Sequence, residues 1–105
     1  MSNMNELMRQ AARVQRKIAS IHEEMKKREW SAKVAGDRVT AVVTGERKIT
    51  RIDVDPEFWK TEERDVVLDS IAAAINAAQE ICEKEIEAEV SKATGGLKIP
   101  GLTGG

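Results

Sequence analysis

Apolar residues near the start of the chain recur on a seven-residue repeat, which is typical of a helix that packs against a second helix. One position of the repeat holds Met4, Ala11, Ile18 and Met25, and the other holds Leu7, Val14 and Ile21. This seam predicts a long amphipathic helix over residues 4–25. A seam of this length on so short a chain requires a partner helix to cover it.

The hydrophobic pattern changes from helical to alternating at Trp30. Three alternating segments follow, at residues 30–34, 39–43 and 49–54, and Gly36-Asp37 and Gly45-Glu46 supply turns between them. Short connections allow only antiparallel pairing of neighbours, because parallel strands need long crossovers. The sequence therefore predicts a three-stranded antiparallel meander.

A second long helix is predicted after the meander. Asp55-Pro56 marks a brief helical turn with Asp as its cap, and this turn carries Phe58 and Trp59. We expect Phe58 and Trp30 in the core, and Trp59 in the core or at a dimer contact. Thr61-Glu62-Glu63 predicts the capped start of the long helix, which runs to about Lys92. Its apolar face is broad enough to pack on two sides and holds Val67, Leu68, Ile71, Ala72, Ala74, Ile75, Ala78, Ile81 and Cys82.

Together these elements predict one α+β domain over residues 1–93. A flexible Gly-rich tail without periodicity follows over residues 94–105. The two apolar helix faces expose more surface than one subunit of 105 residues can cover, so we expect an obligate homodimer.

Charge is distributed unevenly, although the net charge is only −1. Residues 1–54 hold 12 Lys and Arg against 7 Asp and Glu, whereas residues 55–105 hold 5 against 11. This asymmetry indicates either a charged partner or pairing between the two halves of the chain.

A row of cations on the first predicted helix is the principal candidate binding surface. At about 100° per residue, Arg9, Arg13, Arg16 and Lys27 fall within about 60° of one another, nearly opposite the seam, and Lys17 widens the patch. Such a row suits the regularly spaced phosphates of DNA. A solvated helix face, or ion pairs with glutamates of the second helix, would explain the same pattern.

Residues for catalysis are scarce. His22 and Cys82 are the only His and Cys, and their positions favour a boundary histidine and a core thiol over a reactive pair or a zinc site. We therefore expect no enzyme, no cofactor and no small-molecule substrate. The start of the chain lacks the apolar run of a signal peptide, and no run approaches transmembrane length, so we expect a cytoplasmic protein without membrane contact.

The order of long helix, meander, Asp-Pro-Glu turn, long helix and Gly-rich tail resembles the YbaB/EbfC family. The similarity covers nearly the whole chain. Its more specific parts are Val54-Asp55-Pro56-Glu57, the run from Ile71 to Ala78, Thr94-Gly95-Gly96-Leu97 and Pro100-Gly101.

The resemblance implies a tweezer-like homodimer, with prongs built from the long helices and a body built from the sheets. It also implies binding to double-stranded DNA with little sequence preference, on the bacterial nucleoid, and roles in nucleoid organisation and gene regulation. Two tryptophans and one phenylalanine are too few for a base-stacking platform, so phosphate contacts would dominate. A coiled-coil-like interaction adaptor without DNA affinity is the alternative, which the acidic second helix favours.

Overall fold

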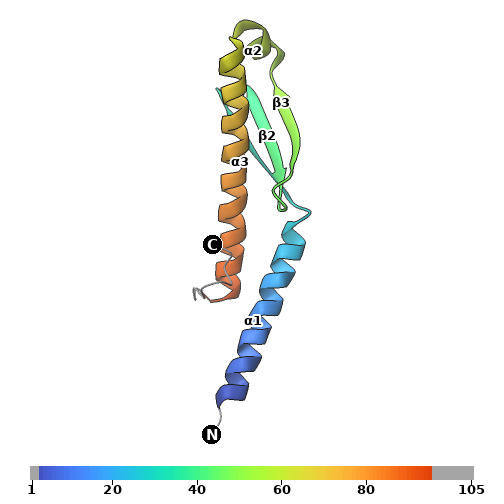
Figure 1. The fold of residues 1–105 in the computed structure, drawn as a ribbon, viewed down its shortest axis with the longest axis vertical. Helices are drawn as coiled ribbons and strands as arrows, with labels where there is room; N and C mark the ends of the chain where they lie inside the picture. The colour runs from blue at the N-terminus through green and yellow to red at the C-terminus, as the bar shows by residue number, and fades with distance from the viewer. Residues whose placement is uncertain (1–2, 96–105) are drawn as a thin grey trace.

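The computed structural model describes residues 3–95. Its elements follow the predicted order of helix, three strands and helix, and the brief helical turn predicted after the strands is a short helix (Figure 1). They are α1 (Asn3–Met25), β1 (Glu29–Val34), β2 (Val39–Thr44), β3 (Ile49–Val54), α2 (Pro56–Thr61) and α3 (Arg64–Ala93). The predicted α+β class and the antiparallel meander are therefore confirmed.

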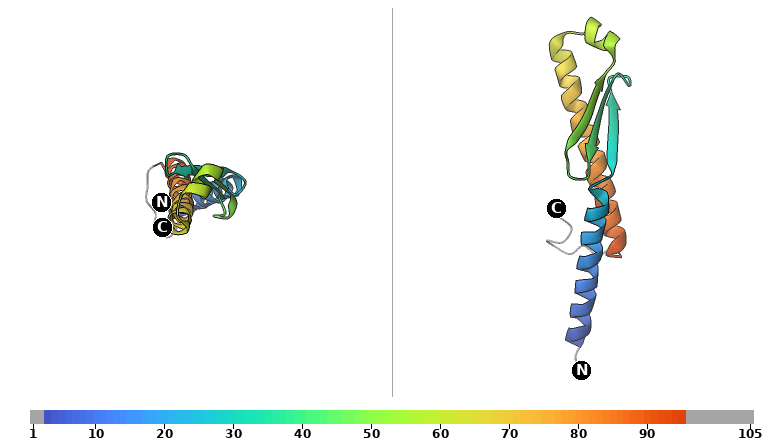
Figure 2. Two further views of the ribbon diagram at one scale, coloured as in Figure 1. Left: turned by 90° about the horizontal axis from the view of Figure 1, so that it is seen from above. Right: turned by 90° about the vertical axis from the view of Figure 1, so that its right-hand side faces the viewer.

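The protomer is elongated, with extents of 73 × 20 × 16 Å. The upper part of α3 covers one face of the sheet, and its lower part runs beside α1 (Figures 1 and 2). The first turns of α1 continue past the end of α3, where no other described helix or strand lies beside them. One long helix is thus clamped to the sheet, whereas the other projects from it.

The sheet has the order β1-β2-β3, with both pairs antiparallel. The β1–β2 turn spans residues 35–38 and holds Ala35, Gly36 and Asp37 at positive φ, a conformation that glycine adopts at the least cost. In β2–β3 the register shifts between Val42 and Val43, which is an irregularity of the bulge type. Ala41 lies opposite Ile52, so the inward face of β3 follows that of β2.

The core lies between α3 and the inner face of the sheet. Small side chains on α3, Ala74 and Ala78, are fully buried and let the helix approach β2 closely. Trp30 and Phe58 are also buried, as predicted. Burial of apolar area contributes roughly 25 cal/mol per Å², which makes this layer the main source of stability. The remaining core members are Met25, Ala32, Val39, Ala41, Val43, Val67 and Cys82.

The start of α3 differs from its prediction. Thr61 does not cap α3; it is the last residue of α2, and its hydroxyl donates to the Glu57 carbonyl at 2.9 Å. The residue that precedes α3 is Glu63, which makes no side-chain capping bond. The predicted Asp55 cap is confirmed, because its carboxylate accepts the Phe58 N–H at 3.3 Å.

The seam of α1 is covered over only half of its length. Ile18 and Met25 are 7% and 4% exposed, because α3 and the sheet lie against them. Met4 and Leu7 are 66% and 58% exposed. The partner helix that the seam requires is thus supplied within the protomer for the second half alone.

Gly45 brings the β2–β3 turn against the end of α1. A Cβ atom at Gly45 would lie 2.0 Å from the carbonyl oxygen of Met25. The Gly45 N–H also donates to the Arg28 carbonyl at 3.2 Å. This backbone contact requires glycine and fixes the direction in which α1 leaves the sheet.

Candidate nucleic-acid interface

The cations of α1 project from the part of the helix that has few neighbours. Arg9, Arg13, Arg16 and Lys17 are all exposed. Over the described residues none of the four forms an ion pair, whereas six ion pairs form elsewhere. The row therefore remains available to a ligand of opposite charge.

Four of the five glutamates between Glu80 and Glu89 on α3 pair with cations other than those of the α1 row. Glu83 binds Arg47 with an N···O distance of 2.7 Å, and Glu85 lies 4.0 Å from Arg28. Glu80 and Glu89 pair within α3, with Lys84 at 3.1 Å and Lys92 at 3.7 Å. Within the described residues, no ion pair joins α3 to the α1 row.

A helix gives the α1 row a fixed spacing. Arg9 and Arg16 are seven residues apart, which corresponds to about 10 Å along the axis at 1.5 Å per residue. The row faces away from the seam, because residues at these positions lie on the opposite side of the 3.6-residue turn. Cations held at fixed intervals on a straight rod match a phosphate backbone without reading its bases.

Lys27 lies beyond the last residue of α1, unlike the other four residues. Because α1 ends at Met25, Lys26 and Lys27 lie in the turn that leads to β1. Lys26 pairs with Glu23 at 3.1 Å, and Lys27 is exposed.

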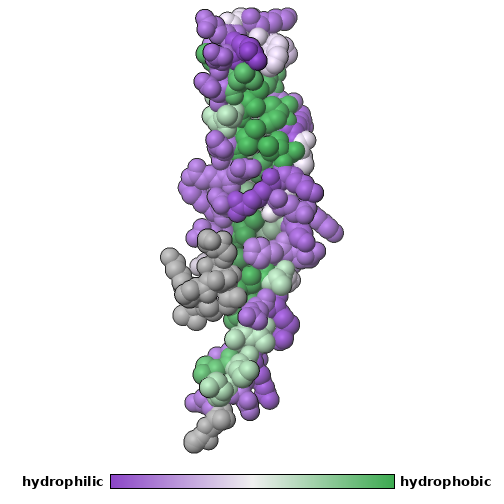
Figure 3. Space-filling view, in the orientation of Figure 1, coloured by the Kyte–Doolittle hydropathy of each residue, from purple (hydrophilic) through white to green (hydrophobic). Residues whose placement is uncertain are grey.

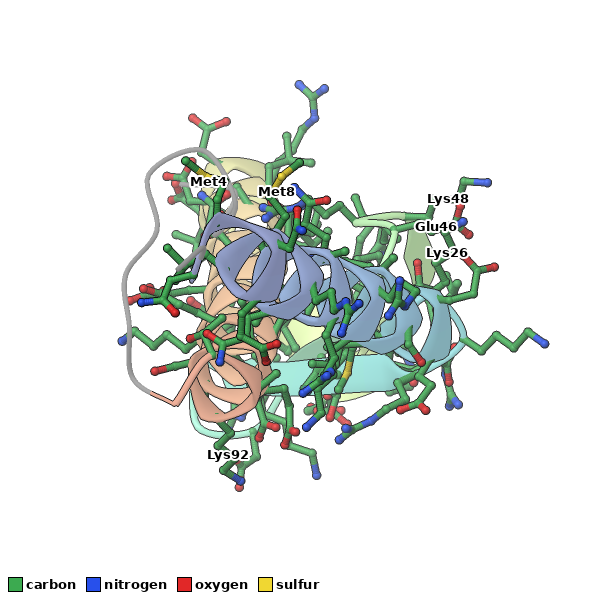
Figure 4. All side chains as sticks on the ribbon, turned by 90° about the horizontal axis from the view of Figure 1, so that it is seen from below. Met4, Met8, Lys26, Glu46, Lys48 and Lys92 are labelled. Atoms are coloured by element: carbon green, nitrogen blue, oxygen red, sulfur yellow. The ribbon has the colours of Figure 1, made fainter. Side chains whose placement is uncertain are left out.

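A second group of cations lies where α1 meets the sheet: helical spacing adds Lys26 and Arg28 to the cationic patch, but it gives no sign of Lys48. Lys48 lies in the β2–β3 turn, and Figure 4 shows it on the same side of the molecule as Lys26. Arg28 from the junction stacks 5.1 Å from the centre of the Trp30 ring. The predicted meander could have placed Lys48 at this junction, because a β2–β3 turn returns the chain to the end of the sheet at which β1 begins.

Neither His22 nor Cys82 forms a reactive site. The Cys82 thiol is buried and donates to the Thr44 carbonyl at 3.7 Å. Burial raises the pKa of Cys82, and Arg47 opposes this effect only in part. His22 is exposed and lines a groove of about 800 Å³ between α1 and α3, whose walls carry both signs of charge.

Residues 3–95 contain no group of three His, Cys, Asp or Glu side chains placed to hold a metal ion. No helix in that range combines the length and the apolar character that crossing a bilayer demands.

Comparison with known proteins agrees with this arrangement. A nucleoid-associated protein of Clostridium acetobutylicum is 38% identical over 95% of this chain and 89% of its own. One from Acetivibrio thermocellus is 39% identical over 95% of this chain and 89% of its own. An uncharacterized protein of Helicobacter pylori has the same fold, with a TM-score of 0.72 and 13% identity over 90% of this chain and all of its own. Residues 1–97 match the model of the YbaB/EbfC DNA-binding family.

Membership in this family accounts for the cationic helix and for the lack of catalytic groups in the described residues. It agrees with the prediction of a non-enzymatic, nucleoid-associated DNA-binding protein. With 95% of its length aligned to the relative from Clostridium acetobutylicum, the chain belongs to the YbaB/EbfC DNA-binding family.

Proposed function

We propose that this protein binds double-stranded DNA through phosphate contacts made by one face of α1, with little preference for sequence. The observation that carries the proposal is the row of Arg9, Arg13, Arg16 and Lys17, which is exposed and free of ion pairs within the described residues. Lys27 adds a contact at the base of α1. No cofactor and no small-molecule substrate takes part.

The placement of the aromatic side chains supports little sequence preference. Trp30 and Phe58 are buried, so neither can stack on a base. Trp59 is 60% exposed, which excludes the predicted core role, but α2 lies at the opposite end of the molecule from the start of α1 (Figure 1). Binding then depends on charge, and contacts to phosphates do not distinguish one base from another.

We infer that the binding form is a homodimer, joined by an open apolar face beside β3. The helix α3 packs on β1 and β2 but hardly touches β3. Ile49 and Leu68 are therefore 47% and 46% exposed, and Ile52 is only half-buried. A hydrophobic band runs along this upper part of the molecule in Figure 3. Trp59 borders a hollow of about 360 Å³ together with Leu68, which extends the face to α2.

Such a dimer has the form of tweezers. The sheets and the upper parts of α3 form its body, and α1 with the lower part of α3 forms each prong. The projection of α1 beyond α3 supports this form, because it holds the cationic rows clear of the body (Figure 2). A protein of this kind would act on the nucleoid in the cytoplasm, in its organisation and in gene regulation.

The dimer is tested by Leu68→Asp. We expect the variant to sediment as a monomer, because burial of an unpaired charge at the interface costs several kcal/mol. Its circular dichroism should stay helical, since Leu68 is not in the protomer core. A wild-type protein that is monomeric at micromolar concentration would overturn the dimer.

DNA binding is tested by changing Arg9, Arg13 and Arg16 together to Ala. We expect affinity for two unrelated duplexes to fall by a similar factor, roughly tenfold or more, since each contact joins a cation to a phosphate. The matched control changes Lys33, Arg51 and Lys60 to Ala, which removes three charges from the sheet and α2. Loss of binding to one duplex only would indicate base readout, and no saturable binding by the wild type would indicate the adaptor.

A further inference from the structure

The first turns of α1 carry an apolar surface that nothing in the described protomer covers. This surface, the α1 tip, consists of Met4, Leu7, Met8 and Ala11, all of them exposed. Leu7 and Met8 are 58% and 63% exposed. Figure 4 shows Met4 and Met8 side by side at the free end of the helix. It continues the seam that packs on α3 farther along the same helix.

The residues that flank the seam differ between its two halves. Beside the α1 tip they are uncharged: Asn3, Gln10 and Gln15. Beside the half that packs on α3 they include Lys17 and Glu24, which line one hollow together with Glu89 and Lys92 of α3. Flanking charges select the partner of such a seam. Uncharged flanks produce no repulsion when the partner is an identical helix.

We propose that the α1 tip binds the α1 tip of a second copy of this protein and so joins two DNA segments. The proposal rests on the DNA-binding function proposed above. The row of Arg9, Arg13 and Arg16 lies on the side of α1 away from the seam. When two tips meet through their seams, their cationic rows therefore face outward in opposite directions, and each can hold its own duplex.

The contact is small, so it is weak between free molecules. Stable interfaces bury about 1,200 Å² or more, whereas four side chains on each helix supply only a part of that. Copies that lie side by side on DNA present many tips at once, and their contacts then act together. Pairing of tips is thus a property of the protein on DNA, and it requires that the duplex be covered.

The test measures capture of a labelled duplex by protein bound to a second, immobilised duplex. Leu7→Gln removes an apolar side chain from the α1 tip, and Asn5→Gln changes a side chain two residues away, about 160° round the helix; neither changes the charge of α1. We expect wild type and Asn5→Gln to capture the labelled duplex and Leu7→Gln to capture at least about tenfold less. The affinity of both variants for a single duplex should be equal.

Two results would overturn the proposal. One is equal capture by Leu7→Gln and Asn5→Gln. The other is a wild-type protein that saturates the immobilised duplex but captures no second one. Failure of the DNA-binding function itself is distinguishable, because the wild-type protein would then fail to bind even the single duplex.

Discussion

The two long helices of this protein differ in how much of their surface is buried and in whether their charges are paired. The helix α3 buries a row of small apolar residues against the sheet, and its glutamates pair with cations of α3 itself, of the α1–β1 junction or of the β2–β3 turn. The helix α1 buries only its last turns, and Arg9, Arg13 and Arg16 make no ion pair within the described residues. Of these two helices, the one with fewer contacts to the rest of the protein presents the charges that a partner can use.

A charge placed in the buried face of α3 tests whether this face stabilises the fold. Ala74 is fully buried, so Ala74→Asp places an unpaired carboxylate in the core. We expect the variant to be unfolded at 25 °C and to show no cooperative transition by circular dichroism. The free-energy cost of the buried charge approaches the whole stability of a small domain. Asp at exposed Ala73, next to it on α3, is the control and should leave the fold intact. A native-like melt of Ala74→Asp would contradict the assigned core.

The two halves of the α1 seam should respond differently to the same shortening of a side chain. Ile18→Ala should lower the free energy of unfolding by roughly 2–4 kcal/mol, because Ile18 is 7% exposed. Leu7→Ala should change it by less than about 0.5 kcal/mol, because Leu7 is 58% exposed. Urea titration of both variants measures the difference. Equal losses would mean that the first half of the seam is covered in the folded protein.

The contact between the β2–β3 turn and α1 sharpens the comparison further. Gly45→Ala should lower the free energy of unfolding by roughly 1–3 kcal/mol, because the added Cβ lies 2.0 Å from the Met25 carbonyl oxygen. Thermal melting measures this loss. Gly36→Ala is not an equivalent control because its φ is +65°, so exposed Ser31→Ala serves instead. A melting temperature equal to that of the wild type would show that α1 does not press on this turn.

The smallest effect expected concerns the thiol on α3. Burial raises the pKa of Cys82, so near neutral pH the thiol stays protonated and reacts slowly with a thiol reagent. The reaction should become fast in urea, where the side chain is exposed. Rapid labelling of the folded protein would mean that α3 separates from the sheet in the native state.

Most of the fold was predictable from hydrophobic periodicity, whereas the remaining features depend on tertiary contacts. A seven-residue repeat and three alternating segments predicted the helices and strands, because those patterns depend only on which face is buried. The predicted start of α3 was wrong. Thr61-Glu62-Glu63 has the composition of a helix cap, but Pro56 begins a helix that continues to Thr61. Gly45 was predicted as a turn, but its approach to Met25 depends on how α1 meets the sheet.

The candidate site was predictable as a set of residues but not as a surface. Helical spacing placed Arg9, Arg13 and Arg16 on one face of α1. Whether those charges meet the glutamates of α3 depends on how far α1 overlaps α3, which no local pattern gives. For Lys27 the same spacing assumes a helix that continues beyond Met25, the last residue of α1, so its place in the row stays a prediction. The predicted Gly-rich tail, residues 94–105, lies outside the described residues from residue 96 onward and stays a prediction.

The measurement that tests the central claim most directly is the salt dependence of DNA affinity for the wild type and for Arg13→Ala. If Arg13 contacts a phosphate, the slope of log K against log[salt] should become shallower by about 0.9, or by twice that when both subunits of a dimer engage the duplex. Lys60→Ala, at the far end of the molecule, should leave the slope unchanged. An unchanged slope for Arg13→Ala would contradict a phosphate-binding role for α1.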